Sequence, residues 1–234
     1  MKFSRGLVAL IFILFFQNIL IADEYLYKDE VIKNPNFREN VNKLGSELYQ
    51  NTGIKLKLVS IKKFEGFSNI FEYEQDLIKK FKEPTIILVF SELDKKVDIH
   101  TNDLSLYKYF DKEQVLSPAA SPLQAFAVAV TSSKNLDSFI MNLTNYGGTI
   151  LPLIGLKAKE ETIGKYSAAL YNGYTDIAEQ IAANKDVTLV NEAGNANKNF
   201  ISILKLFFYG FIIYAIIQYV RRLIYRRKHP DEFE

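Results

Sequence analysis

Residues 85–90 read TIILVF, a continuous apolar run that predicts a strand covered on both faces. Before this run, residues 54–61 read IKLKLVSI, and the alternation of apolar and basic residues predicts a half-buried strand. After it, Glu92–Lys96 predicts a tight turn and Val97–Thr101 a strand that completes a hairpin. A helix expected over Ile70–Phe81 would make the first two strands parallel, with a right-handed connection. The fold class is therefore α/β, with a mixed β-sheet flanked by helices.

Two longer helices frame this region. Asn34-Pro35 predicts a helix start, with Asn34 as N-cap, and Thr52-Gly53 predicts its end. Lys165–Ala183 has apolar residues at helical spacing and predicts a helix near the end of the domain. Between them the pattern is weaker, and we expect short helices at 104–110 and 136–146. The α/β domain is expected to span residues 23–185.

The carboxy-terminal segment Phe200–Val220 reads FISILKLFFYGFIIYAIIQYV, in which Lys205 is the only charged residue. About 20 apolar residues cross a hydrocarbon core of about 30 Å as a helix. We therefore predict a linker at 186–199, one transmembrane helix at 200–220 and a basic tail at 221–234. Five cations follow the span and favour the cytoplasmic side, where they can also attract lipid headgroups. These are Arg221, Arg222, Arg226, Arg227 and Lys228.

The amino terminus has the pattern of an export signal. Lys2 and Arg5 precede an apolar run over Leu7–Ala22, and a charged stretch follows. Residues 1–22 are either a signal peptide cleaved after Ala22 or an uncleaved anchor. Both alternatives place residues 23–199 outside the cytoplasm, so the sequence predicts a bacterial inner-membrane protein whose main domain faces the periplasm.

Charge and cysteine content exclude several classes of protein. Between residues 23 and 199 the sequence has 21 Lys and Arg against 24 Asp and Glu, so the basic excess of the whole chain lies in its two flanks. Because nucleic-acid binding needs a basic patch on the folded domain, we expect no nucleic-acid partner. The chain has no cysteine, which excludes disulfides and thiolate chemistry.

One short segment combines oxygen and nitrogen ligands. Asp98, His100 and Asn102 alternate and project from one face of a predicted strand, and Asp103 follows. A hard cation such as Ca²⁺ or Mg²⁺ would use the oxygens, whereas a transition metal would favour His100 with carboxylates. We therefore expect Asp98, His100 and Asp103 either to hold a divalent cation or to form a solvated strand face. No catalytic residue is assigned.

Two apolar segments raise the question of what they contact. In the predicted span, Lys205 would either snorkel to the outer interface or meet an acidic residue of a partner helix. Tyr209 and Gly210 give the span polar and small features suited to packing against a partner helix. Within the domain, Ala119-Ala120 and Leu123–Val130 are expected to be core, or a protein-docking patch if they are exposed.

The order of these motifs resembles the TPM domain of membrane-tethered proteins. An export signal precedes a helix that ends in Asn51-Thr52-Gly53, and a strong apolar strand precedes the turn Asp94-Lys95-Lys96-Val97. An Ile150-Leu151-Pro152 element then leads to the last helix of the domain. That helix has the family's pattern at Tyr166, Ala169, Leu170, Gly173, Ile177, Ala178, Ile181 and Ala182. The resemblance covers about residues 30–185.

The resemblance implies a mixed α/β fold and a role in assembly, repair or tuning of membrane complexes. In similar proteins, acidic and glycine-containing loops hold metal ions and the proposed phosphatase chemistry. This chain instead has Lys82-Glu83-Pro84-Thr85 and Thr101-Asn102-Asp103-Leu104 at those loops. We therefore expect an accessory or assembly factor that binds and stabilises an integral membrane protein complex. The alternative is a metal-dependent periplasmic phosphatase. The sequence does not indicate an oligomeric state.

Overall fold

The computed structural model describes residues 24–155, 162–191 and 195–228. Within α9 (Asn195–Lys228), the side chains before Phe207 and those of Leu223, Arg226 and Lys228 lie outside this description. The predicted signal segment, residues 1–22, lies outside the described residues. The chain divides into two compact units, Met1–Asn191 and Glu192–Glu234.

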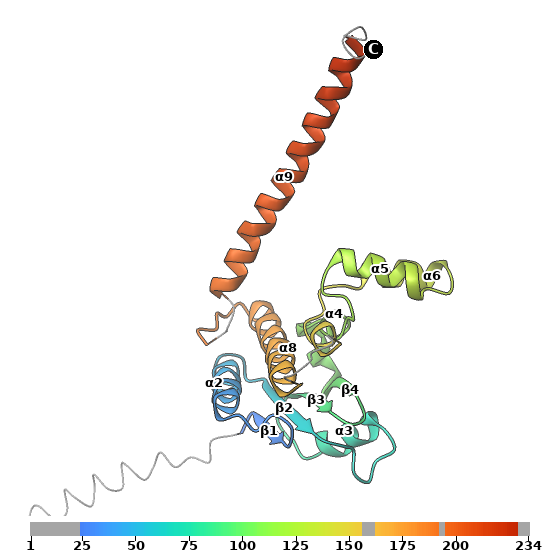
Figure 1. Cartoon of the computed structure of the whole chain (residues 1–234). Coiled ribbons are helices and arrows are strands. Elements are labelled where there is room, and N and C mark those ends of the chain that lie inside the picture. Colours follow the sequence, from blue (N-terminus) through green and yellow to red (C-terminus); the bar gives the residue numbers. More distant parts are fainter. Residues whose placement is uncertain (1–23, 156–161, 192–194, 229–234) are drawn as a thin grey trace, which may run out of the picture. The chain divides into compact units, whose positions relative to one another are not determined.

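The first unit is built on a four-stranded mixed sheet with the strand order β1-β2-β3-β4 (Figure 1). The strands are β1 (Leu26–Asp29), β2 (Lys55–Ile61), β3 (Thr85–Ser91) and β4 (Lys96–Thr101). β2 is parallel to β1 and to β3, and β3 is antiparallel to β4. The predicted mixed sheet, parallel pair and hairpin are confirmed. Strand β1 adds a parallel edge strand within a charged segment that the sequence indicated as extended but did not assign to the sheet.

The strand β2 differs from its prediction in one respect. Alternation predicted a half-buried strand, but every residue from Leu56 to Ile61 is buried, and Lys57 is only 3% exposed. The strand is central and helices cover both of its faces, which an isolated alternating pattern does not reveal.

Helices cover the sheet on both faces. On one face, α2 (Pro35–Thr52) packs on α8 (Thr162–Asn184), and both contact β2; on the other, α3 (Ile70–Ile78) packs on β3 and β4. The larger core places Leu56, Leu58 and Leu88 against α2 and α8, and the smaller core lies under α3. The layers follow from the period of the strands, because successive side chains point to opposite faces.

Capping residues fix the ends of α2 as predicted. The Asn34 side chain accepts hydrogen bonds from the backbone N–H groups of Asn36 and Phe37, and Pro35 occupies the first turn. Gly53 ends the helix with a φ of 72°, a left-handed conformation that favours glycine.

The region between β4 and α8 consists of short helices. They are the 3₁₀ helix η1 (Leu104–Tyr109), α4 (Lys112–Val115), α5 (Pro122–Ser132), α6 (Leu136–Thr144) and α7 (Leu151–Ile154). The helices predicted at 104–110 and 136–146 are confirmed. In Figure 1, α5 and α6 form a hairpin that stands out from the sheet. The two helices pack mainly on each other.

The second unit contains the long helix α9. The segment 200–220 lies within it, so its predicted helical conformation is confirmed. Within the part of the chain that the structure describes, no helix combines the length and apolar character needed to cross a membrane.

Candidate functional site

The residues predicted to bind a cation lie on or next to β4, but each has a partner within the protein. The Asp98 Oδ1 atom forms an ion pair with Lys112 Nζ at 2.6 Å and also accepts the backbone N–H of Ile99 at 2.7 Å. The ring of His100 contacts Gln75, with 2.8 Å between Nε2 atoms. Asp103 caps η1 by accepting the backbone N–H of Ser105. Asp103 therefore has a local structural role.

The described residues do not bring three or more His, Asp or Glu side chains into an arrangement that could hold a metal ion. Asp98 and His100 share one face of β4, as alternation predicted. The predicted third ligand, Asp103, lies beyond the end of the strand. Whether these residues bind a divalent cation stays a prediction.

A carboxyl group that sequence reasoning missed lies beside them. Glu74 of α3 is 0% exposed, and neither carboxyl oxygen has a hydrogen-bond partner among the described atoms. Burial, reinforced by the negative charge of Asp98, raises the pKa of Glu74 to about 8, against the opposing effect of Lys112. Glu74 is therefore a neutral acid at pH 7.

The burial of Glu74 could have been predicted from helical spacing. Glu74 precedes the buried Leu77 and Ile78 by three and four positions, so it lies on the same face of α3. Phe71, one turn earlier on α3, is 58% exposed and contacts the His100 ring edge-on.

The group around Glu74 mixes acids, a base and a cation. Burial and the charge of Lys112 lower the pKa of His100, whereas Asp98 opposes this effect. His100 is consequently neutral at pH 7. The cluster contains one ion pair, Asp98–Lys112, and two uncharged titratable groups. The described atoms of this cluster provide no second activated group and no oxyanion donor set for hydrolysis.

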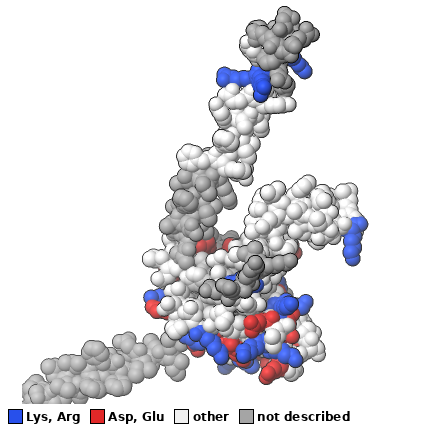
Figure 2. All heavy atoms as spheres, in the orientation of Figure 1, with Lys and Arg blue, Asp and Glu red and all other residues white. Residues whose placement is uncertain are grey.

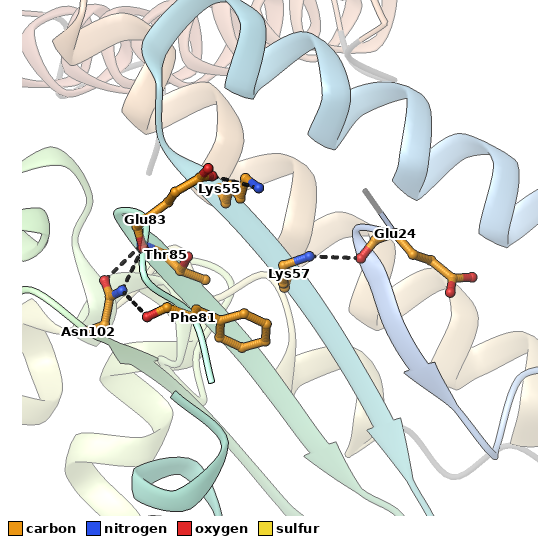
Figure 3. A network of polar contacts seen from close by, with 7 residues as sticks. All are labelled: Glu24, Lys55, Lys57, Phe81, Glu83, Thr85 and Asn102. Carbon is orange, nitrogen blue, oxygen red and sulfur yellow. Dashed lines mark hydrogen bonds and ion pairs between the residues drawn. The ribbon is translucent and has the colours of Figure 1, made fainter. Parts of the chain in front are cut away.

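Polar side chains also gather where β2 and β3 begin and β4 ends (Figure 3). Asn102 accepts the backbone N–H of Thr85 at 2.8 Å and donates to the carbonyls of Phe81 and Glu83. Lys55 forms an ion pair with Glu83 at 2.6 Å. These contacts join the start of β3 to the end of β4, so Asn102 holds the sheet edge together.

Lys57 is buried at the same end of the sheet. Its ammonium group donates to the carbonyl of Glu24 at 3.1 Å (Figure 3). It also lies 5.3–5.7 Å from the ring centroids of Tyr25, Tyr27 and Phe81. Aromatic faces and a carbonyl replace water around this cation. The contacts explain how a lysine is tolerated inside the sheet, and they link β1 to β2.

The α5–α6 hairpin exposes large apolar side chains. Leu123 is 78% exposed, Leu136 is 72% exposed and Phe126 is 52% exposed. The expectation that Leu123–Val130 is core is therefore wrong for its large residues, although Ala125 and Ala129 are buried. In Figure 2 the hairpin is almost entirely white, with basic atoms at its end. A contiguous surface of this kind usually marks a contact with a protein or a membrane.

A second apolar surface lies on α9. From Phe207 to Val220 every described side chain is exposed, including Tyr209. Apart from the adjoining residues and the backbone of α9 itself, no described atom lies within 4 Å of the position that a Cβ atom of Gly210 would occupy. Arg221, Arg222 and Arg227 are exposed beyond this stretch, whereas the side chains of Lys205, Arg226 and Lys228 lie outside the described part.

Comparison with protein-family models finds no match for this chain, and comparison with curated proteins finds none either. The resemblance to the TPM domain therefore stays a hypothesis. The features that bear on function are therefore the two exposed apolar surfaces, on the α5–α6 hairpin and on α9.

Proposed function

We propose that this protein is a membrane-anchored accessory or assembly factor that binds and stabilises a larger integral membrane protein complex. The observation that carries the proposal is the exposed apolar surface of α9, ending in exposed arginines. In water such a surface would be unfavourable, at about 25 cal/mol per Å² of apolar area. A bilayer and a partner helix would both cover it.

The anchoring segment is proposed at 200–220. A helix of this length extends about 30 Å, which matches a hydrocarbon core. The proposed segment starts at residue 200, whereas the described side chains of α9 start at Phe207. The described apolar stretch is therefore only part of the proposed anchor. The arginines that follow would remain in the cytoplasm, and residues 23–199 would face the periplasm of a bacterial inner membrane.

Gly210 supports a partner-helix contact. Glycine is unfavourable in a helix interior by about 1 kcal/mol relative to alanine, and the surroundings described for Gly210 provide no packing reason for it. Small residues let two helices approach closely in a membrane. Gly210 and the adjacent Tyr209 are therefore proposed to face the partner, with Lys205 one turn away from Tyr209.

In vivo photocrosslinking of the full-length chain tests this proposal. A photoreactive residue at Tyr209 should capture one specific integral membrane protein. Gly210→Leu should abolish that product, because a bulky side chain keeps the helices apart. Ala215→Leu is the matched control, since residue 215 lies about 140° around the helix from residue 210. Capture of lipid alone, or of many proteins equally, would contradict the proposal.

The alternative function, a metal-dependent phosphatase, has less support. Asp98 is paired with Lys112 and Asp103 caps η1, so each would have to exchange an existing contact for a metal ion. Assay of the purified full-length chain for phosphomonoester hydrolysis with Mg²⁺, Ca²⁺ or Zn²⁺ separates the two functions. Activity that Asp98→Asn abolishes would favour the phosphatase.

A further inference from the structure

Each helix of the α5–α6 hairpin has a stripe of large exposed apolar side chains, and only Met141 of α6, which is 61% exposed, lies off it among the described residues of the hairpin helices. In α5 these are Leu123, Phe126 and Val130, at spacings of three and four residues. In α6, Leu136, Ile140 and Leu143 follow spacings of four and three. At about 100° per residue, each set covers a narrow sector of its helix. We call these six side chains the apolar face.

The two helices run antiparallel, because only residues 133–135 connect them and their other ends meet at the base. There, Ser117 Oγ, before α5, donates to the carbonyl of Asn145, after α6, at 3.0 Å. Asn142 Nδ2 in the last turn of α6 also donates to Ser133 Oγ in the connection at 3.0 Å. Seen from the start of each helix, the stripe lies about 120–130° around the helix axis from the side that packs on the other helix. The direction of this rotation is the same in α5 and α6. Because the helices run in opposite directions, both stripes fall on one side of the hairpin.

The opposite side of the hairpin is mainly polar, with Met141 as its one large exposed apolar side chain in the described helices, and it is almost uncharged. Gln124 and Thr131 of α5 and Thr144 of α6 are exposed there. From residue 114 to residue 156 the only charged residues are Lys134 and Asp137, at the tip. The hairpin thus has one apolar side and one mainly polar side, and its charged residues lie at the tip.

The dimensions of the hairpin favour lipid as the occupant of the apolar face. Its helices have 11 and 9 residues, which is about 17 and 14 Å and too short to cross a bilayer core. A stable protein interface uses about 20–30 residues from each partner, against the six of the apolar face. Lipid chains require no complementary shape. Hollows in the described surface lie along α2, beside α4 and near the start of α8, away from this face.

We propose that the α5–α6 hairpin lies in the plane of the membrane surface, with its apolar face among the lipid chains and Lys134 among the headgroup phosphates. The proposal rests on the membrane anchoring proposed above, which brings the domain to the bilayer. It gives the domain a second attachment to lipid besides α9. Interfacial helices of this kind bury their apolar side about 5–10 Å into the headgroup and acyl boundary.

Tryptophan fluorescence can test the proposal cleanly, because the chain has no tryptophan. Full-length Phe126→Trp is reconstituted into phosphatidylethanolamine–phosphatidylglycerol vesicles with and without brominated phosphatidylcholine. We expect a blue-shifted emission that brominated lipid quenches at least twofold and that aqueous iodide quenches weakly. Phe71→Trp, at an exposed position on α3, should show the opposite behaviour.

A third variant separates failure of this inference from failure of the anchor. Phe208→Trp in α9 should be quenched by brominated lipid if α9 is inserted. If the Phe208→Trp variant is quenched while the Phe126→Trp variant responds only to iodide, the hairpin proposal is overturned and the anchor stands. If emission from the Phe126→Trp variant is blue-shifted but insensitive to brominated lipid, a protein surface such as a second copy covers the face, which also overturns it. If neither variant is quenched by brominated lipid, both proposals fail.

Adjacent residues on α5 provide a matched pair of charge substitutions. Val130 belongs to the apolar face, and Thr131 lies on the polar side. In the Phe126→Trp background, Val130→Glu should reduce quenching by brominated lipid at least twofold, whereas Thr131→Glu should leave it unchanged. Equal effects of the two substitutions would contradict the proposed orientation.

Discussion

Glu74 provides a quantitative test of the core under α3. Its pKa is raised from 4.5 to about 8 by burial first and by Asp98 second. Below pH 4.5 the group is protonated in the folded and unfolded chain, so it does not disfavour folding through charge. As the pH rises from 4.5 to 8, the unfolded chain releases the proton and the folded chain retains it. Stability therefore falls over this window and levels off above pH 8.

The size of this loss in the free energy of unfolding follows from about 1.36 kcal/mol for each pH unit between the unfolded and folded pKa values. The loss is about 3 kcal/mol at pH 7 and about 5 kcal/mol above pH 8, relative to pH 4.5. Glu74→Gln keeps the size of the side chain and cannot ionise. It should consequently be more stable than the wild type by up to about 3 kcal/mol at pH 7, with a much flatter pH profile.

Urea unfolding of the full-length chain in detergent micelles, followed by circular dichroism between pH 5 and 9, measures both quantities. Asp76→Asn is the control, because Asp76 lies on the same helix with 53% of its side chain exposed, paired with Lys80. It should change the stability by less than about 1 kcal/mol. A Glu74→Gln variant that is less stable than the wild type at pH 8, or keeps the same pH profile, would refute the reasoning.

Three further outcomes are expected. Lys112→Met removes the cation that opposes the raised pKa of Glu74, so the fall in stability should extend to higher pH, as read from the same unfolding curves. Tyr174→Phe deletes a buried hydroxyl that donates to a carbonyl of β2 at 2.8 Å, and should lower the free energy of unfolding by about 1–2 kcal/mol; no loss would contradict the role of this hydrogen bond. Glu47→Ala removes the acceptor for the backbone N–H of Val190, whose hydrogen exchange should accelerate at least tenfold, and an unchanged rate would contradict the contact.

Much of the fold was predictable from local patterns. The pair Asn34-Pro35 predicted the start of α2 and Gly53 its end, and the structure has the helix between them, with Phe37, Val41 and Leu44 buried. The run at 85–90 predicted a strand covered on both faces, because a strand with one solvated face alternates between apolar and polar residues.

Tertiary context decided the points at which prediction failed. Alternation in β2 placed Lys57 on a solvated face, but β1 and the rings of Tyr25 and Tyr27 cover it, and nothing local to β2 encodes that cover. The stretch from Leu123 to Val130 was expected to be core because it is apolar, and apolar composition does not reveal what packs on a segment. Only the packing of α5 on α6 shows that the stripe faces outward.

In the candidate site, too, local patterns predicted some features and tertiary context decided the others. Strand alternation placed Asp98 and His100 together, as observed. Lys112 comes from α4, and its pairing with Asp98 depends on how the chain returns over β4. Burial of Glu74 was readable from its spacing to Leu77, but the raised pKa required knowledge of which groups surround it.

Labelling of single cysteines tests the anchored topology most directly, because the chain has no native cysteine. Leu93→Cys lies at a 66% exposed position of the domain, and Arg227→Cys lies near the end of α9. In intact spheroplasts, a membrane-impermeant maleimide should label residue 93 at once and residue 227 only after permeabilisation. Labelling of residue 93 only after permeabilisation, or equal labelling of both in intact spheroplasts, would contradict a periplasmic domain held by one membrane helix.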